Sequence, residues 1–332
     1  MKCGGDSAVG QTAAHPDTST AGSAFRQVSR ELRAVRSQRW GNPWGYLFIT
    51  PALILFLVFN IWPIFRGLAM AFTDYRYLVV GSEWKWNGLN NFREMFTNDP
   101  QFWQSLWISI KFTLLSFPAS ILLAFGAALL ISRIHRALLA GAYRVIAYLP
   151  VILPVSVAIY LWAQLYSYQY GYINLVLTDV FGVQSPPNWL GDVKLALPSI
   201  VVASLWKSFG ANTLLVLVGI YGISDELYQA AAIDGAGTLR QIWSITLPLL
   251  RPIFVLIIIL SAGIASVTEE PLLMTQGGPA NSTLTLGLYL YQQAFLFGDQ
   301  RLGYAAAMSL FLGVIHMVAA AITFKLLRTE RG

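Results

Sequence analysis

Six long apolar segments, separated by shorter polar stretches, account for most of the chain beyond residue 44. Each approaches the roughly 20 residues that an α-helix needs to cross the hydrocarbon core of a bilayer. Prolines inside the first three segments are typical of bundled helices, in which neighbouring helices and water satisfy the carbonyls that proline frees. We therefore predict an all-α membrane protein with six transmembrane helices. The predicted spans are about 45–71, 105–132, 142–166, 195–222, 251–270 and 303–326.

The composition agrees with a membrane protein. Hydrophobic residues make up 56% of the 332 residues and charged residues only 11%, whereas a soluble domain carries about a quarter of its residues as charges. Too few charges remain to cover a water-facing surface, which excludes an ordinary soluble enzyme and a disordered chain. The only cysteine is Cys3 and the three histidines are scattered, so we expect neither a disulfide framework nor a metal site. No nucleophile–base constellation is visible, and we expect no catalytic residue.

Lysines and arginines are distributed unevenly between the segments that connect the predicted spans. With the N-terminus in the cytoplasm, 14 of them fall in cytoplasmic segments, 7 in outer segments, and Lys207 lies within a span. Cytoplasmic segments of membrane proteins carry the excess of basic residues. We therefore predict a multi-pass protein of the plasma membrane with both termini in the cytoplasm.

The first 40 residues are polar, rich in Gly, Ala, Ser and Thr, and end in a run of spaced arginines. They lack the apolar core and cleavage site of a signal peptide. A basic stretch next to the membrane is favoured over nucleic-acid binding, because aromatic residues do not alternate with the arginines. We predict a disordered basic cytoplasmic tail over 1–40 and a lipid-embedded domain over 41–332.

The segment between spans four and five, residues 223–250, is the most distinctive part of the sequence. Ser224 can cap a short helix whose first turn holds Asp225 and Glu226, where the helix dipole favours acidic side chains. Tyr228 and the alanines that follow give this helix a smooth face. Its shape suits the groove of another protein, with an amphipathic helix on the membrane surface as the alternative.

The second half of this segment begins with a glycine. Gly235 supplies a bend, and a second helix is predicted from about Thr238. Pro248 and Pro252 then direct the chain back into the membrane. The segment is therefore expected to be two short helices with a break between them.

This segment resembles the signature loop of ABC-importer permeases, in which EAA is followed by three residues, Gly, nine residues, Ile, one residue and Leu-Pro. Ala230 and Ala231 are followed by Gly235 at the same spacing, and Asp234–Ala236 matches the common DGA extension. Gln229 replaces the usual Glu, so no charge-assisted contact is expected from that position. The resemblance implies that this segment couples the protein to an ATPase. The implied coupling residues are Glu226, Tyr228, Gln229, Ala230, Ala231, Asp234, Gly235, Ala236, Ile245, Leu247 and Pro248.

The resemblance extends over most of the chain beyond the tail. The sequences Ala71–Tyr75 and Gly88–Phe92 are similar to the AFTDY and GLxNF elements of sugar-type permeases, and Gly277–Thr283 is similar to their GGP-x-N-x-T outer loop. Trp206-Lys207 resembles the WK of span four. Val267–Glu270 stands where the family often has VFDE, with Thr268 and Glu269 in place of Phe-Asp. The chain thus resembles the maltose, glycerol-phosphate and multiple-sugar permeases.

Several expectations follow from this family. The fold would be the MetI-like core of type I ABC-importer permeases, and the function would be one half of the sugar pathway of an importer that works by alternating access. Its partners would be a second, homologous permease subunit, two ATP-binding subunits and an extracytoplasmic sugar-binding protein. The chain has no GxxxxGK[ST] phosphate loop. ATP and Mg²⁺ are therefore expected on the partner ATPase, and no cofactor is expected on this chain.

Polar and aromatic side chains inside the predicted spans are candidates for the sugar pathway, since sugar sites combine stacking faces with hydrogen-bonding groups. An ionisable group at mid-span, such as Lys207, is a functional candidate by default. Its structural alternatives are an ion pair with Glu269 or Glu270 and a side chain that reaches the interface. The candidates are Ser156, Tyr160, Gln164, Trp206, Lys207, Ser208, Asn212, Ser266, Thr268, Glu269 and Glu270.

Other classes of protein fit less well. A secondary transporter would show inverted repeats and buried ion-coupling carboxylates near the midplane, and neither is apparent. A membrane-embedded enzyme would need a metal or nucleophile constellation, such as two histidines at i and i+4. Within the ABC class, a permease for amino acids or peptides is the alternative, and the GLxNF-like and GGP elements speak against it.

Overall fold

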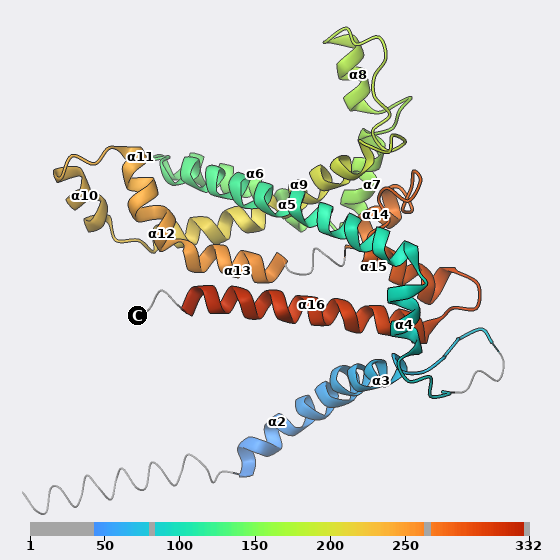
Figure 1. Ribbon diagram of the computed structural model, residues 1–332. Coiled ribbons are helices and arrows are strands. Elements are labelled where there is room, and N and C mark those ends of the chain that lie inside the picture. The colour runs from blue at the N-terminus through green and yellow to red at the C-terminus, as the bar shows by residue number, and fades with distance from the viewer. Residues whose placement is uncertain (1–42, 80–83, 262–266, 329–332) are drawn as a thin grey trace, which may run out of the picture. The chain divides into compact units, whose positions relative to one another are not determined.

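The computed structural model describes residues 43–79, 84–261 and 267–328, in which the regular elements are helices joined by turns and loops (Figure 1). Within them, extended pairing is limited to an isolated bridge between Thr73 and Trp86. The all-helical prediction is confirmed. The predicted tail 1–40 lies outside the described residues, and so does the candidate Ser266.

The chain divides into two units, one ending at Phe65 and one beginning at Arg66. The first unit contains α2 (Pro43–Phe56), the π-helix η1 (Leu57–Ile61) and the start of α3 (Trp62–Met70). With the rest of α3, which belongs to the second unit, they form one apolar helix over Tyr46–Met70 that is long enough to cross a membrane. No residue in the most apolar 18-residue window of this helix is buried.

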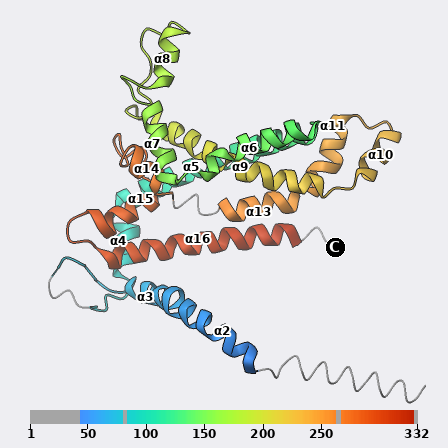
Figure 2. The ribbon, with the colours of Figure 1, turned by 180° about the vertical axis from the view of Figure 1, so that it is seen from behind.

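The second unit is a bundle of long helices with shorter helices at both ends. Its long helices are α5 (Pro100–Ser132), α6 (Ala137–Ile152), α7 (Val155–Leu165), α9 (Ala196–Tyr221), α13 (Arg251–Ser261) and α16 (Leu302–Arg328). Its short helices are α4 (Asn90–Thr97), α8 (Tyr172–Asp179), α10 (Asp225–Ile233), α11 (Thr238–Gln241), η2 (Ile242–Thr246), α12 (Leu247–Leu249), α14 (Glu269–Met274), α15 (Leu286–Tyr291) and η4 (Gln292–Leu296). Figures 1 and 2 place α10–α12 at one end of this unit and α4, α14 and α15 at the other.

The membrane-spanning helices differ from straight rods in two places. Four described helices are long and apolar enough to cross a membrane, and two bent helix pairs bring the total to as many as six. The third predicted span is bent by 97° between α6 and α7, and the segment α11–α12 meets α13 at 56°. The predicted fifth span, 251–270, is not one helix: α13 ends at Ser261 and Glu269 begins the separate helix α14.

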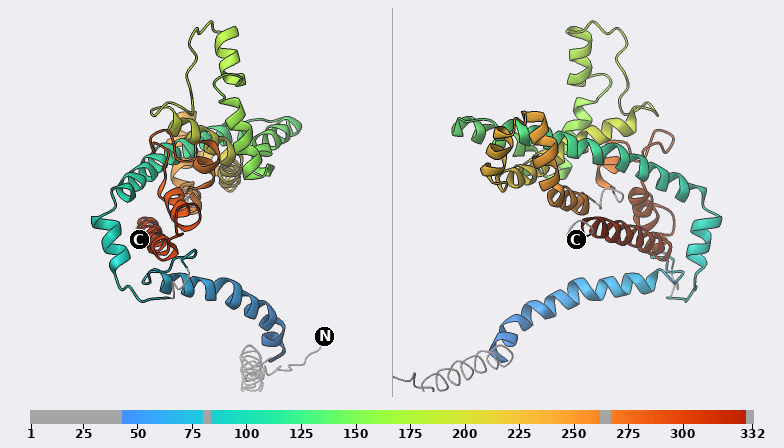
Figure 3. Two further views of the ribbon diagram at one scale, coloured as in Figure 1. Left: turned by 90° about the vertical axis from the view of Figure 1, so that its right-hand side faces the viewer. Right: turned by 60° about the vertical axis from the view of Figure 1, so that its left-hand side comes forward.

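Helices α5 and α9 form the centre of the second unit. The buried positions of α5 include small residues about four apart, Ser116, Ser120, Ala124 and Ala128. Small side chains let two membrane helices approach closely. Asn212 of α9 donates a hydrogen bond to the hydroxyl of Ser120 across this contact (2.8 Å). Helix α13 packs beside the half of this pair that is nearer to α10–α12, and α16 runs alongside α13 (Figures 2 and 3).

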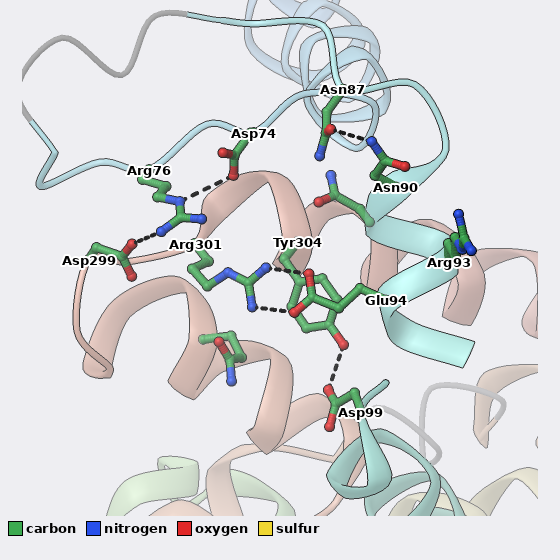
Figure 4. Close-up of polar contacts among 12 residues, drawn as sticks. Asp74, Arg76, Asn87, Asn90, Arg93, Glu94, Asp99, Asp299, Arg301 and Tyr304 are labelled. Carbon is green, nitrogen blue, oxygen red and sulfur yellow. Dashed lines mark hydrogen bonds and ion pairs between the residues drawn. The ribbon is translucent and has the colours of Figure 1, made fainter. Parts of the chain in front are cut away.

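A polar cluster joins α4, α5, α15 and α16 at the end opposite α10–α12 (Figure 4). Asp99 caps α5 by accepting hydrogen bonds from the backbone N–H groups of Gln101 and Phe102. Its other oxygen accepts hydrogen bonds from the hydroxyls of Tyr289 (2.7 Å) and Tyr304 (2.5 Å). One carboxylate therefore sets the start of α5 and holds α15 and α16 against it.

Ion pairs of two arginines complete this cluster. Arg301, at the start of α16, makes a two-pronged contact with Glu94 of α4 at 2.8 and 2.6 Å. Arg76 contacts Asp299 and also Asp74 (Figure 4). The hydrogen bond from Arg76 holds the pKa of Asp299 below its ordinary value.

The lowered pKa of Asp299 predicts a loss of stability in acid. A carboxylate with a depressed pKa stabilises the fold above its ordinary pKa of 3.8 and loses that contribution as pH falls through its folded value. Because the pair is partly exposed, we expect its contribution to be about 1 kcal/mol or less. Asp299→Asn should lower the melting temperature at pH 7, and the difference from the unmodified protein should shrink by pH 3. A difference that stays constant with pH would contradict this assignment.

Candidate functional site

The segment 223–250 protrudes from the end of the bundle as two arms joined by a turn (Figure 1). Ser224 caps α10 by accepting a hydrogen bond from the backbone N–H of Glu226, and Asp225 and Glu226 occupy the first turn. This is the N-terminus that local capping rules predict, with acidic side chains where the helix dipole favours them. The first arm therefore begins where the sequence places it.

The turn depends on Gly235. Its backbone φ is +77°, in the left-handed region that residues with a Cβ rarely adopt. Its N–H donates to the carbonyl of Ala232, and the N–H of Ala236 donates to that of Ala231. A Cβ at this position would meet no atom within 4 Å. Glycine is thus required by the backbone conformation and not by lack of space.

The second arm differs from the helix that the sequence predicts. Helix α11 begins at Thr238, as expected, but the chain then forms a π-helical turn over Ile242–Thr246 before α12. The wider turn shifts the side chains that follow it. As a result Thr246 is buried, and its hydroxyl shares a hydrogen bond with the phenol of Tyr228 (3.0 Å). Tyr228 therefore braces the two arms instead of lying on the outer face.

Gln241 provides the second brace. Its side-chain N–H groups donate to the carbonyl of Tyr228 (3.3 Å) and to that of Ala236 (3.2 Å). Together with the Tyr228–Thr246 bond, these contacts tie α10, the turn and the second arm into one body. These hydrogen bonds hold the segment in one shape up to the start of α13.

Five of the eleven predicted coupling residues lie on the outer surface of this body. Gln229, Ala230, Asp234 and Gly235 are exposed, as is Glu226. Large apolar side chains stand beside them: Ile233 is 87% exposed, Leu239 73% and Trp243 66%. Exposed apolar side chains gathered at one tip are typical of a protein–protein contact. The remaining predicted residues, Ala231, Ala236, Ile245, Leu247 and Pro248, are partly buried and support the segment from within.

A cavity of about 750 Å³ separates this body from the ends of α5 and α9. Arg133 and His135 line one side, and Asp225, Tyr228 and Gln241 line the other. The body thus contacts the bundle mainly through α12 and Leu250, which is fully buried where α12 meets α13.

The second candidate region surrounds the sharp bend between α6 and α7. The last carbonyls of a helix have no partner inside it, and the hydrocarbon core supplies no water for them. Lys207 of α9 provides a donor for these carbonyls. Its Nζ donates to the carbonyl oxygen of Leu153 (2.9 Å) and lies 3.5 Å from the carbonyl oxygen of Pro150. Among the described residues, no ion pair joins Lys207 to Glu269 or Glu270, so the structure does not support the alternative of an ion pair.

Glu270 lies on the other side of Lys207. Its Oε1 accepts a hydrogen bond from Ser204 of α9 (3.2 Å). Lys207 and Glu270 line one small cavity of about 10 Å³ with Trp162 and apolar residues of α7 and α9. That is the space of about one water molecule. Trp162 packs edge-on against Trp206 with ring centroids 5.9 Å apart.

The other predicted pathway residues are divided between surfaces and helix contacts. Ser156, Tyr160 and Gln164 are exposed on α7, and Glu269 is exposed at the start of α14. Thr268 precedes α14 and is partly buried. The hydroxyl of Ser208 donates to the carbonyl of Ser204 within α9. Asn212 is buried against Ser120 and does not line the Lys207–Glu270 cavity.

Removal of the Lys207 ammonium should destabilise the bundle. Lys207→Met leaves the carbonyls of Leu153 and Pro150 without their donor, and each unsatisfied buried group costs about 1–3 kcal/mol. We expect a clearly lower melting temperature in detergent, whereas Lys207→Arg, which keeps charge and donors, should recover much of the loss. Equal melting of Lys207→Met and the unmodified protein would contradict a capping role.

Sequence reasoning missed the residues that act through tertiary contacts. Thr246 and Gln241 brace the coupling segment, and Ser204 holds Glu270, but none belongs to a recognisable pattern. Trp162 could have been found, since it is an aromatic side chain inside the third predicted span, two residues after the candidate Tyr160. The others required knowledge of which helices meet.

Comparisons with known proteins agree with this architecture. The sequence pattern of the family described as "Binding-protein-dependent transport system inner membrane component" matches residues 116–328. The chain is 35% identical over 300 residues to the probable ABC transporter permease protein YesP of Bacillus subtilis, covering 89% of this chain and 93% of that one. It is 32% identical to the sulfoquinovosyl glycerol transport system permease protein SmoG of Agrobacterium fabrum, covering 86% and 90%. It is also 32% identical to the trehalose/maltose transport system permease protein MalF of Thermococcus litoralis, covering 82% and 90%.

A solved structure shares the fold. A chain of a bacterial ABC transporter involved in the import of the acidic polysaccharide alginate superposes with a TM-score of 0.76. The match covers 91% of this chain and 100% of that chain at 22% identity. The MetI-like membrane fold expected from the sequence is therefore confirmed.

Proposed function

Because the chain belongs to the family of binding-protein-dependent transport system inner membrane components, we propose that it is a permease subunit of an ATP-driven sugar importer. The observation that carries this proposal is the braced segment 223–250, which presents an exposed apolar tip beyond the end of the bundle. A rigid projection of this kind suits a protein that receives mechanical work from a partner. The chain would supply half of the translocation pathway and perform no covalent chemistry.

The class of cargo is inferred from the relatives. The names of several relatives at 30–32% identity specify trehalose/maltose, lactose or arabinooligosaccharides. These names favour sugar import over the import of amino acids or peptides. The alternative of a secondary transporter has no support among them.

Coupling would proceed through the braced segment. Two ATP-binding subunits in the cytoplasm would close on ATP, with ATP and Mg²⁺ held by them and not by this chain. Their movement would push the tip around Gly235, and the braces at Tyr228 and Gln241 would carry the displacement to α12 and α13. A second, homologous permease subunit would rock against this one and open the pathway alternately to each side.

The remaining partners follow from the same scheme. An extracytoplasmic binding protein would deliver the sugar to the end that carries α14 and α15. This arrangement requires both termini in the cytoplasm, which agrees with the excess of basic residues in the predicted cytoplasmic segments. The region around Lys207, Glu270 and Trp206 is the proposed pathway wall.

The test is purification of the tagged full-length chain from its native membrane in mild detergent, followed by mass spectrometry. We expect a P-loop ATPase and a second permease to copurify, and radiolabelled-sugar uptake to require the chain. Recovery of a folded, monodisperse chain alone would favour a self-sufficient transporter and contradict the proposal. Uptake of amino acids or peptides in place of sugars would refute the cargo while leaving the importer intact.

A further inference from the structure

A second cavity lies at the end of the bundle opposite the coupling segment. It has a volume of about 530 Å³, is open on one side, and is lined by α5, the start of α9 and the loop before α15. Apolar residues form most of its wall, including Ile108, Leu115 and Leu197. Its polar lining consists of Gln104, Lys111, Lys194 and Ser282. It shares no residue with the coupling segment or with the Lys207–Glu270 cavity.

The charge of this cavity is positive and uncompensated. Lys111 and Lys194 both line it, and no acidic residue does. Neither lysine forms an ion pair with any residue that the structure describes. The nearest acid along the chain, Asp192, uses Oδ1 to accept hydrogen bonds from the backbone N–H groups of Lys194 and Leu195. Lys111 Nζ lies 5.5 Å from the ring centroid of Trp107, within cation–π range. Two ammonium groups therefore share one apolar cavity.

The depth of these residues can be estimated from the length of α5. The helix has 33 residues, whereas the hydrocarbon core needs about 20. Counting about 20 residues back from its inner end, near the basic residues Arg133 and Arg136, places the opposite boundary of the hydrocarbon close to Lys111. Lys111 and Trp107 then stand at the headgroup level, where lysine and tryptophan side chains are stable.

The side chains that line the cavity become less polar along α5 toward the centre of the membrane. Gln104 is outermost, Trp107 and Lys111 follow, and Leu115 lies one turn deeper on α5. These positions are three or four residues apart, so they share one helix face. A face that passes from amide through cation to aliphatic side chain has the polarity profile of a phospholipid, from headgroup to acyl chain.

The third wall of the cavity is held in place. The N–H of Leu286 donates to the hydroxyl of Ser109 in α5 (2.8 Å), and the hydroxyls of Thr275 and Thr283 share a hydrogen bond of 2.6 Å. These contacts fix the loop that brings Ser282 to the cavity. The hydroxyl of Ser282 has no hydrogen-bond partner among the described residues. A buried hydroxyl without a partner therefore lies in the wall that also carries the two lysines.

We propose that this cavity binds the headgroup of an anionic phospholipid from the leaflet opposite the coupling segment. Lys111 and Lys194 contact the phosphate, Gln104 and Ser282 serve the polar headgroup, and the first methylenes of an acyl chain lie against Leu115. An acidic sugar carries the same kind of charge but fits less well. Its hydroxyls would lose water against the aliphatic wall without gaining partners, which is costly.

The test uses the complete importer, purified and reconstituted in phosphatidylcholine nanodiscs. The phosphatidylglycerol content of the nanodiscs is varied from zero to about 30%. Native mass spectrometry then counts the phosphatidylglycerol molecules that stay bound. We expect Lys111→Gln and Lys194→Gln each to weaken this binding about fivefold, since a basic residue at a lipid surface contributes about 1 kcal/mol. Lys85→Gln is the matched control, because Lys85 is exposed at the same end and lies outside the cavity.

Melting temperatures separate binding from folding. Both cavity lysines are exposed and unpaired in the described structure, so their glutamine variants should melt like the unmodified complex. Equal retention of phosphatidylglycerol in the double variant would overturn the proposal, and so would equal retention of phosphatidylcholine by the unmodified protein. Binding of an oligouronate in pure phosphatidylcholine that is lost in the double variant would also overturn it, and would assign the cavity to an acidic sugar.

Discussion

Gly235→Asp is expected to abolish ATPase capture and transport while leaving the bundle folded. Gly235 sits at the exposed tip with φ +77°, and a Cβ there meets nothing within 4 Å. The substitution therefore costs only local backbone strain, about 1–2 kcal/mol. At a docked tip, however, the new carboxylate would stand beside Asp234 and be desolvated without a designed partner. Mismatched charge in an interface costs several kcal/mol, so we expect sugar uptake to fall at least thirtyfold.

The measurement is copurification of the ATPase, with uptake and melting temperature followed in parallel. Gly182→Asp is the matched control, because Gly182 has φ +67°, an open environment and a place in the loop that follows α8. It should leave capture and uptake unchanged. Gly235→Asn separates the effect of the added charge from the effect on backbone conformation, because asparagine is uncharged and adopts the left-handed region about as readily as aspartate. Normal uptake by Gly235→Asp would refute the proposed coupling role of this segment.

Local rules were enough to predict much of the coupling segment. The cap at Ser224, the bend at Gly235 and the helix start at Thr238 depend on residues within a few positions of each other. Such features depend on hydrogen bonds and backbone angles of residues that are close in sequence, and they can therefore be predicted from the sequence. The π-helical turn over Ile242–Thr246 was not predictable in this way. It changes the helical phase, so Thr246 turns toward Tyr228 although the 3.6-residue period does not place it there.

Tertiary partners account for most of what the sequence did not reveal. Lys207 was expected to pair with a carboxylate or reach the interface, but it caps the carbonyls at the end of α6. The prolines of that span indicate an interruption of the helix. Hydropathy, however, is averaged over a window of residues and therefore does not predict the angle of a bend. Asp99 likewise looks like a simple helix cap, and its bonds to Tyr289 and Tyr304 bridge about 200 positions of sequence. Contacts of this kind require the packed bundle.

The capping of α6 depends on how closely α6 and α9 approach, and this gives the second prediction. Gly210 of α9 lies against the backbone of α6. A Cβ at this position would stand 2.2 Å from the carbonyl oxygen of Ala147 and 2.7 Å from the Cα of Tyr148. Backbone atoms cannot rotate aside as a side chain can. The two helices would have to separate, and Lys207, one turn away on α9, would move away from Leu153.

Gly210→Ala is therefore expected to destabilise the bundle by more than about 3 kcal/mol, at the upper end of the range for overpacking. Gly126→Ala in α5 is the matched control, since its new methyl group would meet no atom within 4 Å. That variant should melt at or slightly above the temperature of the unmodified protein, because alanine is the better helix former. Thermal unfolding in detergent measures both. Equal melting of the two variants would show that α6 and α9 do not meet through Gly210.

A double variant tests whether the helix contact and the cap form one unit. If Gly210→Ala displaces α6, the Lys207 bonds are already lost, and adding Lys207→Met should cost little more. Substitutions that share a contact are non-additive by about 0.5–3 kcal/mol, whereas independent ones add. We expect the double variant to be clearly more stable than the sum of the single losses predicts. Full additivity would mean that Lys207 caps α6 without help from the close approach at Gly210.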